Sequence, residues 1–361
     1  MTKIGVLTSK TPLKRGVWNN DFYPLIKWAG KFRDHDIRIK FYSSYKENIA
    51  DEEVVLIDYR FFAKRVQGIG FLEESYIIEI IEKLKKNSRR IILFDTNDPT
   101  GSRCFGVTPH VDVHLKKQLL KDKNEYTFDR GDKSVMCWIP NQHTPSKIPY
   151  KTCRKEDLPK LKLGWNIGLV DYRSFPFQRF YPFSTLKLFN NFYKVPYFSK
   201  PGKNKSLLTS FRGKIHQDTR YSFQRKSVFD ALDNLAKTFP VAYGSPLPRK
   251  EYFKELKQSK AIISPFGWGE ICYRDFEAYL NGAVLIKPSM SHLETFPDYF
   301  IENVTYLSVN WDMHDLENIL EKVCSNFDDY LHVAITGQER FKNSIKDSDS
   351  FIQHFKKNVL E

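Results

Sequence analysis

The sequence predicts an α/β protein made of two Rossmann-like domains, each built on a parallel sheet. Three observations predict it: the chain length, an alternation of short apolar strands with helical stretches in the first half, and a second start of the same alternation after residue 205. At 361 residues the chain is long for one domain, because a typical domain has about 150 residues. Strands that alternate with helices are typical of parallel sheets joined by right-handed crossovers.

The alternation begins at the N-terminus. Residues 3–8 (KIGVLT) are expected to form the opening strand, and residues 53–59 (EVVLIDY) a strand that is buried on both faces. Residues 75–86 carry isoleucine and leucine at helical spacing, and residues 90–94 (RIILF) form the next expected strand. We expect an N-terminal domain over residues 1–170.

The second half repeats this pattern. Its expected strands are residues 206–211, 241–243, 261–264 and 283–287, and its expected helices are residues 225–239, 249–257, 271–280 and 316–323. We expect an interdomain segment at residues 171–205 and a C-terminal domain over residues 206–340. A C-terminal helix at residues 341–361 is expected to pack back on the N-terminal domain.

The composition favours a globular protein with anionic partners. A formal net charge of +14 favours nucleotide diphosphates, nucleic acid or the anionic face of a membrane. No apolar run approaches the roughly 20 residues that span a bilayer, and the N-terminal apolar stretch is too short for a signal peptide, so we expect a cytoplasmic protein. The five cysteines contain no CxxC pair, which argues against zinc knuckles and a disulfide framework.

The most informative stretch is residues 260–288, KAIISPFGWGEICYRDFEAYLNGAVLIKP. An expected strand leads into a turn with Gly267 and Gly269, and a helix is expected from about Glu270. Glycines let the backbone approach a ligand closely, and a helix N-terminus offers unpaired N–H groups to phosphate oxygens. Glu277 lies two helical turns beyond Glu270, on the same face. The turn is therefore a candidate ligand site.

This stretch resembles the donor-binding half of GT-B glycosyltransferases, most closely an exostosin-like group among bacterial surface-polysaccharide enzymes. The resemblance is carried by EAYLNGAV at residues 277–284, by SPFGWG at residues 264–269 and by SFRG at residues 210–213. It covers roughly residues 207–307. It implies a GT-B-like fold, in which two Rossmann-like domains with parallel sheets face a central cleft.

The resemblance also implies roles for individual residues. Glu277 would hold the ribose hydroxyls of a nucleotide-sugar donor, and the turn from Gly267 to Glu270 would face the donor sugar and its phosphates. The family pattern places its two glutamates one residue further apart than Glu270 and Glu277, and Gly269 stands where the first would be. The diphosphate is bound by side chains and helix N-termini in this family, so no metal and no other cofactor are expected.

Further residues are expected at the donor. Arg212 and Lys214 follow a strand in TSFRGK, where they can clamp a diphosphate and stabilise its charge in the transition state. The alternative is a solvated basic loop. Arg274 is expected at the donor or in a structural ion pair, and Trp268 either stacks on the base or caps the core. By analogy of fold, Tyr243 contacts the base.

The acceptor side is expected in the N-terminal domain. An inverting enzyme needs a general base there, usually Asp, Glu or His. The loop DTNDPTGS follows an expected strand and supplies Asp98, the first candidate, and Asp95; His110 is the third, and Asp58 a further candidate. Asx residues before proline are also ordinary turn formers. The sequence HVDVH at residues 110–114 fits no usual zinc spacing and is expected to be a strand with one polar face.

The leading hypothesis is a glycosyltransferase that moves a hexose or related sugar to a growing surface glycan: lipopolysaccharide, O-antigen or capsule. A lipid-linked acceptor would place it peripherally on the inner face of the plasma membrane. The aromatic and basic residues between 171 and 205 fit nucleic-acid stacking, a membrane interface or packing between domains. The alternatives are a nucleic-acid-binding protein, whose usual motifs are not found, and a sugar-binding protein without catalysis.

Overall fold

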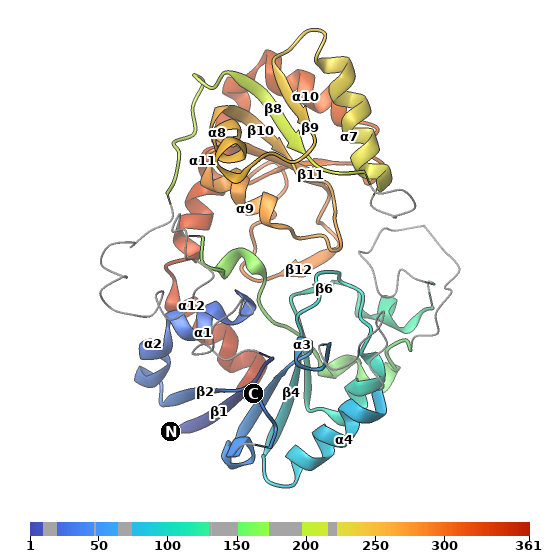
Figure 1. Cartoon of the computed structure of the whole chain (residues 1–361), viewed down its shortest axis with the longest axis vertical. Helices are drawn as coiled ribbons and strands as arrows, with labels where there is room; N and C mark the ends of the chain where they lie inside the picture. The colour runs from blue at the N-terminus through green and yellow to red at the C-terminus, as the bar shows by residue number, and fades with distance from the viewer. Residues whose placement is uncertain are drawn as a thin grey trace. The chain divides into compact units, whose positions relative to one another are not determined.

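The computed structural model describes residues 1–9, 20–46, 48–63, 74–129, 131, 151–172, 197–215 and 222–361 (Figure 1). It divides into two compact units. The first comprises Met1–Pro196, Glu294–Pro297 and Asp347–Glu361, and the second comprises Tyr197–Leu293 and Asp298–Lys346. Most of the segment expected between the domains, residues 173–196, lies outside the described residues.

The described part of the first unit contains a six-stranded parallel sheet. Its strands are β1 (Thr2–Leu7), β2 (Ile37–Tyr42), β3 (Val54–Asp58), β4 (Arg90–Asp95), β5 (Val113–Lys116) and β7 (Leu161–Leu163). They lie in the order β2-β1-β3-β4-β5-β7, and each pairs with its neighbours in parallel. The helices of this unit are α1 (Tyr23–Lys27), α2 (Ala29–Asp34), α3 (Arg60–Ala63), α4 (Glu74–Lys85) and α12 (Ser348–Phe355).

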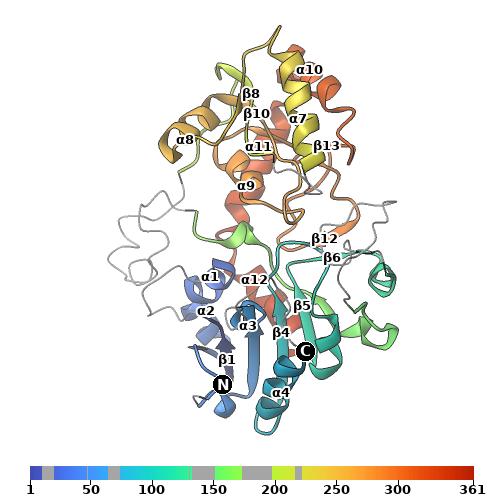
Figure 2. The ribbon, with the colours of Figure 1, turned by 45° about the vertical axis from the view of Figure 1, so that its right-hand side comes forward.

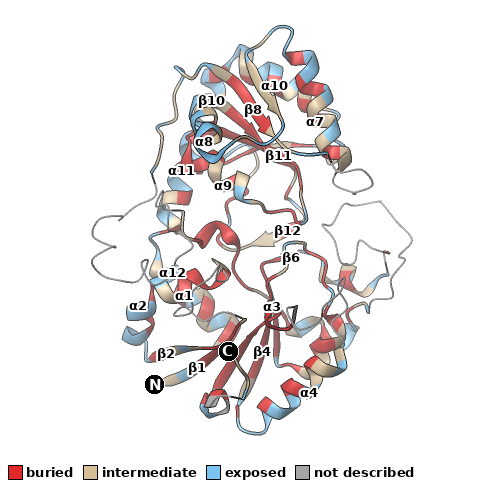
Figure 3. Cartoon of the chain, viewed as in Figure 1, coloured by how far each residue is buried: buried red, intermediate tan, exposed pale blue. Residues whose placement is uncertain are grey.

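Both faces of this sheet are covered. Ile92 and Phe94 of β4 belong to one buried cluster, and Ile91 and Leu93 belong to another, because alternate side chains of a strand point to opposite faces. α4 covers the second face, and α1, α2 and α12 contribute to the first. The inner strands β3 and β4 are buried along nearly their whole length, as Figure 3 shows for β4. This explains the continuous apolar runs of β3 and β4.

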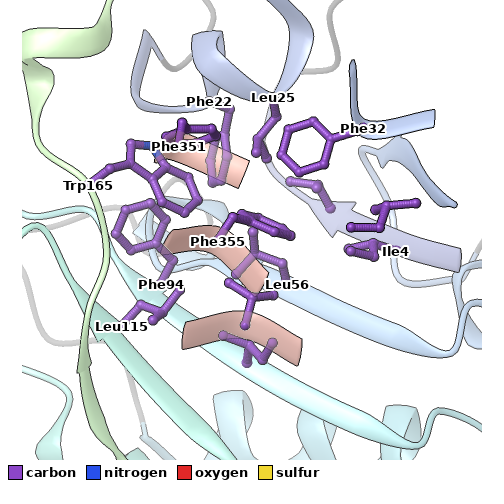
Figure 4. Close-up of a cluster of buried hydrophobic side chains, with 14 of the residues drawn as sticks. Ile4, Phe22, Leu25, Phe32, Leu56, Phe94, Leu115, Trp165, Phe351 and Phe355 are labelled. Atoms are coloured by element: carbon purple, nitrogen blue, oxygen red, sulfur yellow. The ribbon is translucent and has the colours of Figure 1, made fainter. Parts of the chain in front are cut away.

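The last helix of the chain packs in the first unit. Its Phe351 and Phe355 rings lie 5.3 and 5.9 Å from the Trp165 ring, whose other neighbour is Phe94 at 4.5 Å. Figure 4 shows these four side chains in one cluster. The indole Nε1 of Trp165 donates to the main-chain oxygen of Asp21 at 2.6 Å. The chain thus returns to its first unit after completing the second.

The second unit contains a five-stranded parallel sheet in its described residues. Its strands are β8 (Leu207–Arg212), β9 (Val241–Gly244), β10 (Ser259–Ile263), β11 (Val284–Pro288) and β13 (Leu307–Val309), in the order β13-β11-β10-β8-β9. Its helices are α7 (Ser222–Leu235), α8 (Arg249–Gln258), α9 (Tyr273–Leu280), α10 (Leu316–Ser325) and α11 (Phe327–Ser344). Figures 1 and 2 show α8, α9 and α11 on one face and α7 and α10 on the other. A separate pair consists of β6 (Gln118–Leu120) of the first unit and β12 (Leu293–Thr295), of which Glu294 and Thr295 also belong to the first unit.

The two sheets share one topology. If the strands of each sheet are numbered along the chain, the first five strands of both follow the order 2-1-3-4-5 of doubly wound proteins. The prediction of two Rossmann-like units with parallel sheets is confirmed. In this topology the strand order reverses between β1 and β3 in the first unit and between β8 and β10 in the second. Ligands of such sheets bind at the carboxyl ends of the strands beside that switch point.

One predicted strand is wrong. Residues 105–110 form a 3-10 helix, η3 (Phe105–His110), and the strand begins only at Val113. All residues of β5 are buried, so it has no polar solvent face. The reason is that β5 lies between β4 and β7 in the sheet interior, where His114 and Lys116 have buried polar partners.

Across the described ranges, none of the helices has both the length and the apolar character that a bilayer crossing requires.

The packing of α12 gives a stability prediction. Phe355→Ala is expected to lower the free energy of unfolding by about 3–5 kcal/mol, because it empties space beside Phe32 and Trp165. Gln353→Ala, on the exposed side of the same helix, should change it by less than about 0.5 kcal/mol. Urea unfolding measures both. Equal effects would show that α12 does not contribute to the core of the first unit.

Candidate functional site

The switch point of the second sheet lies between the ends of β8 and β10. Arg212 is the last residue of β8. Arg274, from the first turn of α9, donates from its guanidinium Nη2 to the main-chain oxygen of Arg212 at 2.6 Å. The same guanidinium lies 4.7 Å from the centroid of the Phe211 ring. Arg274 therefore joins the helix after β10 to the end of β8, across the switch point.

A buried ion pair holds the glycine-containing turn between β10 and α9. The Lys287 ammonium lies 2.7 Å from Asp275 Oδ2 and 2.8 Å from the main-chain oxygen of Glu270. Lys287 and Asp275 are both fully buried. The other carboxylate oxygen of Asp275 accepts from Ser264 Oγ at 2.5 Å, and Oδ2 also accepts from the Cys272 N–H at 3.1 Å. The Asp275 carboxylate thus connects Ser264 at the beginning of the turn, Cys272 at its end, and Lys287 on the neighbouring strand β11.

This arrangement also sets where α9 begins. The helix was expected from about Glu270, whereas it starts at Tyr273. Asp275 caps Cys272, whose backbone is extended (φ −129°), and so the three residues from Glu270 to Cys272 stay outside the helix. The turn is therefore longer than the sequence pattern indicated.

The residues of the turn differ in exposure. A side chain at Gly267 would meet no atom within 4 Å, so the backbone there faces open space. Trp268 is 58% exposed, which places it outside the core, while Gly269 and Glu270 are buried. The side chain of Glu270 is closed to solvent in this conformation. Gly267 and Trp268 are the parts of the turn that a ligand can reach directly.

Arg212 is engaged within its own unit. Its guanidinium makes a bidentate contact with the Glu255 carboxylate of α8, with the shortest nitrogen–oxygen distance 2.6 Å, and donates to the main-chain oxygen of Tyr243 at 2.6 Å. The Tyr243 ring lies 6.2 Å from the Phe229 ring of α7, and it is the main-chain oxygen of Tyr243 that accepts from Arg212. A phosphate at Arg212 would share its guanidinium with Glu255 or displace it.

Glu277 is bound by a side chain from the neighbouring helix. The Tyr252 hydroxyl of α8 donates to Glu277 Oε2 at 2.7 Å. Burial raises the pKa of Glu277, while the Tyr252 hydrogen bond and the charge of Arg274 oppose that rise. The structure therefore brings Arg212, Arg274 and Glu277 together at one edge of the sheet. Lys214, two residues beyond Arg212, is exposed.

The switch point of the first sheet carries a polar cluster. The Asp58 carboxylate at the end of β3 accepts from Thr8 Oγ1 at 2.9 Å, from Thr96 Oγ1 at 2.8 Å and from the Arg60 N–H at 3.0 Å. Thr8 follows β1 and Thr96 follows β4, so Asp58 links the ends of three neighbouring strands. Asp58 itself is fully buried. Its carboxylate therefore organises this edge of the sheet and is not accessible to a substrate.

Asp98 is the accessible acid at this edge. It lies 2.8 Å from the Lys117 ammonium and 3.3 Å from Arg60 Nη2, and its side chain is 48% exposed. Arg60 also pairs with Asp21 at 3.2 Å. Burial raises the pKa of Asp98, but the charges of Lys117 and Arg60 outweigh it and hold the pKa below its usual value. Asp21 and Lys117 were not singled out from the sequence, because Asp21 lies just before α1 and Lys117 just after β5, and only folding brings these two segments together.

The other two acceptor-side candidates are placed differently. Asp95 is fully buried, and the Lys116 ammonium lies 2.9 Å from its Oδ2 atom. His110 ends η3 and lies 3.4 Å from Glu82 near the end of α4. Because η3 precedes β5 and α4 precedes β4, His110 lies at the amino edge of the sheet, opposite the edge that carries Asp98. The structure thus separates His110 from the other candidates and leaves Asp95 without access to solvent.

Asp95, Cys104 and His114 form a group that could hold a metal ion, with ligand atoms within 4.8 Å of one another. Lys116, however, places a buried ammonium 2.9 Å from Asp95 Oδ2, the oxygen that lies 3.9 Å from His114 Nε2, and a divalent ion there would face its positive charge. Burial lowers the pKa of His114 and raises that of Cys104, so the thiol keeps its proton. The group fits a buried ion pair with neutral neighbours better than a metal site.

The fold defines an α/β protein of two units with doubly wound parallel sheets. The sequence matches no protein-family model and has no significant match among curated proteins. Solved structures similar in fold include glycosyltransferases. One is an α-glucosyltransferase in complex with UDP and a 13-mer DNA containing a HMU base, which is 10% identical, with 100% of both chains covered and a TM-score of 0.48.

Two further similar structures are TarM and Anabaena Alr3699/HepE in complex with UDP and glucose. TarM is 6% identical over 85% of this chain and 55% of its own, with a TM-score of 0.48. HepE is 10% identical over 100% of both chains, with a TM-score of 0.47.

The buried pair beneath the turn gives the second prediction. Lys287→Met is expected to lower the free energy of unfolding by about 3–5 kcal/mol, because it leaves the Asp275 carboxylate buried without its cation. Lys254→Met, at an exposed position of α8, removes the same charge and should change stability by less than about 0.5 kcal/mol. Urea unfolding compares them. A Lys287→Met protein as stable as the control would contradict the proposed role of the pair.

Proposed function

We propose that the chain is a glycosyltransferase that binds a nucleotide-diphosphate sugar at the carboxyl edge of its second sheet. The observation that carries this proposal is the meeting of Arg212, Arg274 and Glu277 at the switch point, beside a turn whose Gly267 faces open space. Doubly wound sheets bind nucleotides at this place. Cations and a glycine turn suit a diphosphate, and an acid suits the hydroxyls of a ribose or hexose.

Each donor residue has a distinct proposed task. Arg212 and Lys214 neutralise the diphosphate, whose charge rises as the sugar leaves. Arg274 supports the end of β8 and adds positive charge beside Glu277, which accepts from sugar hydroxyls. Trp268, being exposed, offers a ring face for the base or the transferred sugar. We propose that the diphosphate is bound by these groups without a metal.

For the acceptor we propose the switch point of the first sheet. Asp98 is accessible and held as a carboxylate by Lys117 and Arg60, and in an inverting transfer it would take the proton of the attacking hydroxyl. Asp95 and His110 are weaker candidates, because one is buried in an ion pair and the other lies at the opposite edge.

We further propose that the transferred sugar is a hexose and that the acceptor is a surface glycan such as lipopolysaccharide, O-antigen or capsule. The enzyme would then act in the cytoplasm, at the inner face of the membrane. The net charge of +14 supports an anionic acceptor, and most of that charge lies in residues 1–196. The same charge supports the second candidate, binding of nucleic acid. A competition experiment separates these two candidate functions, by adding either an oligonucleotide or a lipid diphosphate to the transfer reaction. If the oligonucleotide inhibits transfer more strongly than the lipid diphosphate does, the result would favour binding of nucleic acid.

The donor site gives the third prediction. A nucleoside diphosphate such as UDP or GDP is expected to raise the melting temperature, since a ligand at 100 times its Kd stabilises the native state by about 2.7 kcal/mol. Glu277→Gln and Arg274→Gln should abolish most of that rise, while Glu251→Gln, an exposed acid of α8, should keep it. A thermal-shift assay measures this. If no nucleoside diphosphate stabilises the native chain, the donor site is wrongly assigned.

The acceptor side gives the fourth prediction. Asp98→Asn is expected to lower the rate of sugar transfer by about 100-fold or more, because a positioned base contributes about that much. Donor affinity should stay the same. Asp34→Asn, at an exposed position of α2, is the matched control and should transfer at the normal rate. Transfer by Asp98→Asn at more than half the normal rate would exclude Asp98 as the base.

A further inference from the structure

We infer that Tyr252 is a positioning residue, which fixes the Glu277 carboxylate so that its second oxygen can accept from a vicinal diol of the bound nucleotide. The inference rests on the proposed donor site and deepens it, because it names a residue outside the expected set and the part of the ligand that it affects. Tyr252 belongs to α8 and Glu277 to α9. The contact therefore depends on how two separate helices pack.

The geometry gives the two carboxylate oxygens different environments. Tyr252 donates its hydroxyl to Glu277 Oε2 at 2.7 Å. Within the described residues no donor reaches the other oxygen, Oε1. Arg274, three residues before Glu277 on the same helix, has its Nη2 donor directed to the main-chain oxygen of Arg212. One oxygen is thus engaged by the protein, and the other has both of its lone pairs available.

The helix that carries Tyr252 is itself held in place. Glu255 lies one turn after Tyr252 and binds the guanidinium of Arg212 at the end of β8. Leu256 of the same helix is buried. Residues three positions apart share a face of a helix, so Tyr252 and Glu255 lie on the same side of α8. The Arg212–Glu255 pair thereby sets the position of the Tyr252 hydroxyl relative to α9.

This arrangement suits a pair of adjacent hydroxyl groups. A carboxylate oxygen with two lone pairs can accept from both hydroxyls of a diol, provided that the carboxylate does not rotate. A hydrogen bond to a charged group contributes about 1.5–3 kcal/mol. A nucleotide without its 2′-hydroxyl should therefore bind roughly 10-fold to 100-fold more weakly than its ribose counterpart.

The test compares ribose and deoxyribose nucleotides on the Tyr252→Phe protein. The probes are UDP or GDP, whichever stabilises the wild-type chain, and its 2′-deoxy counterpart, with Kd values measured by calorimetry. Tyr252→Phe removes only the hydroxyl, which contacts Glu277 and also lies beside Arg274. It is expected to reduce the ribose preference at least fivefold and to weaken binding of the deoxynucleotide less than binding of the ribonucleotide, because the deoxynucleotide keeps only the 3′-hydroxyl of the diol. Tyr330→Phe, which removes a hydroxyl from α11 of the same unit, should keep the full preference.

The pH dependence provides a second readout. Burial raises the pKa of Glu277, and the negative charge of Asp275 adds to that rise. The hydrogen bond from Tyr252 and the positive charges of Arg274 and Arg249 counteract it by stabilising the charged form. Without that hydroxyl the pKa of Glu277 should rise further. As the pH is lowered, Glu277 should therefore become protonated, and the ribose preference should be lost, at a higher pH in Tyr252→Phe than in the wild type. A role in packing alone would not move this midpoint.

The outcomes separate the two proposals. If neither nucleotide binds the wild-type chain, the donor site itself is wrong, and this inference fails with it. If the ribose nucleotide binds but Tyr252→Phe keeps the full preference, only the positioning role is overturned. An equal loss of affinity for both nucleotides would likewise overturn it, because it would show a general structural effect.

Discussion

The contact between the Lys287 ammonium and the Asp275 carboxylate is the constraint on which the second unit's candidate site depends. Both groups are buried, and each has additional hydrogen-bond partners in the turn that follows β10. A buried ion pair is stable only when such partners are present. Asp275 also accepts from the Cys272 N–H, so the same carboxylate fixes the start of α9 at Tyr273 and with it the places of Arg274 and Glu277 on that helix.

The first unit uses a similar device. Lys116 lies on the strand next to β4, and its ammonium contacts Asp95 at the end of β4 and the main-chain oxygen of Gly101 in the loop that follows. In both units a lysine from the neighbouring strand therefore holds a loop that leaves the carboxyl edge. Such a loop can stay open to a ligand on one side while its base is held by charge. This explains why Asp98 is accessible although Asp95, three residues earlier, is not.

The donor and acceptor proposals depend on different kinds of side-chain contact. In the second unit the polar groups bridge elements that are distant in sequence, as Arg212 does with Glu255 and Tyr252 with Glu277. In the first unit the negative charge of Asp98 is balanced by the positive charges of Lys117 and Arg60. Charges that are paired in this way have defined positions before a ligand binds, which reduces the entropy lost on binding.

The sequence by itself determined the class of fold, three strands of the first sheet, most strands and helices of the second unit, and the turn around Gly267, since these follow from local apolar periodicity and from glycine between a strand and a helix. Only the tertiary structure decided which charged residues meet. His110 lies at the opposite edge from Asp98, and Tyr252 reaches Glu277, because strand order and helix packing set these distances. Residue spacing along the chain carries no information about contacts between separate elements, so the partners of a site become visible only once the sheets have formed.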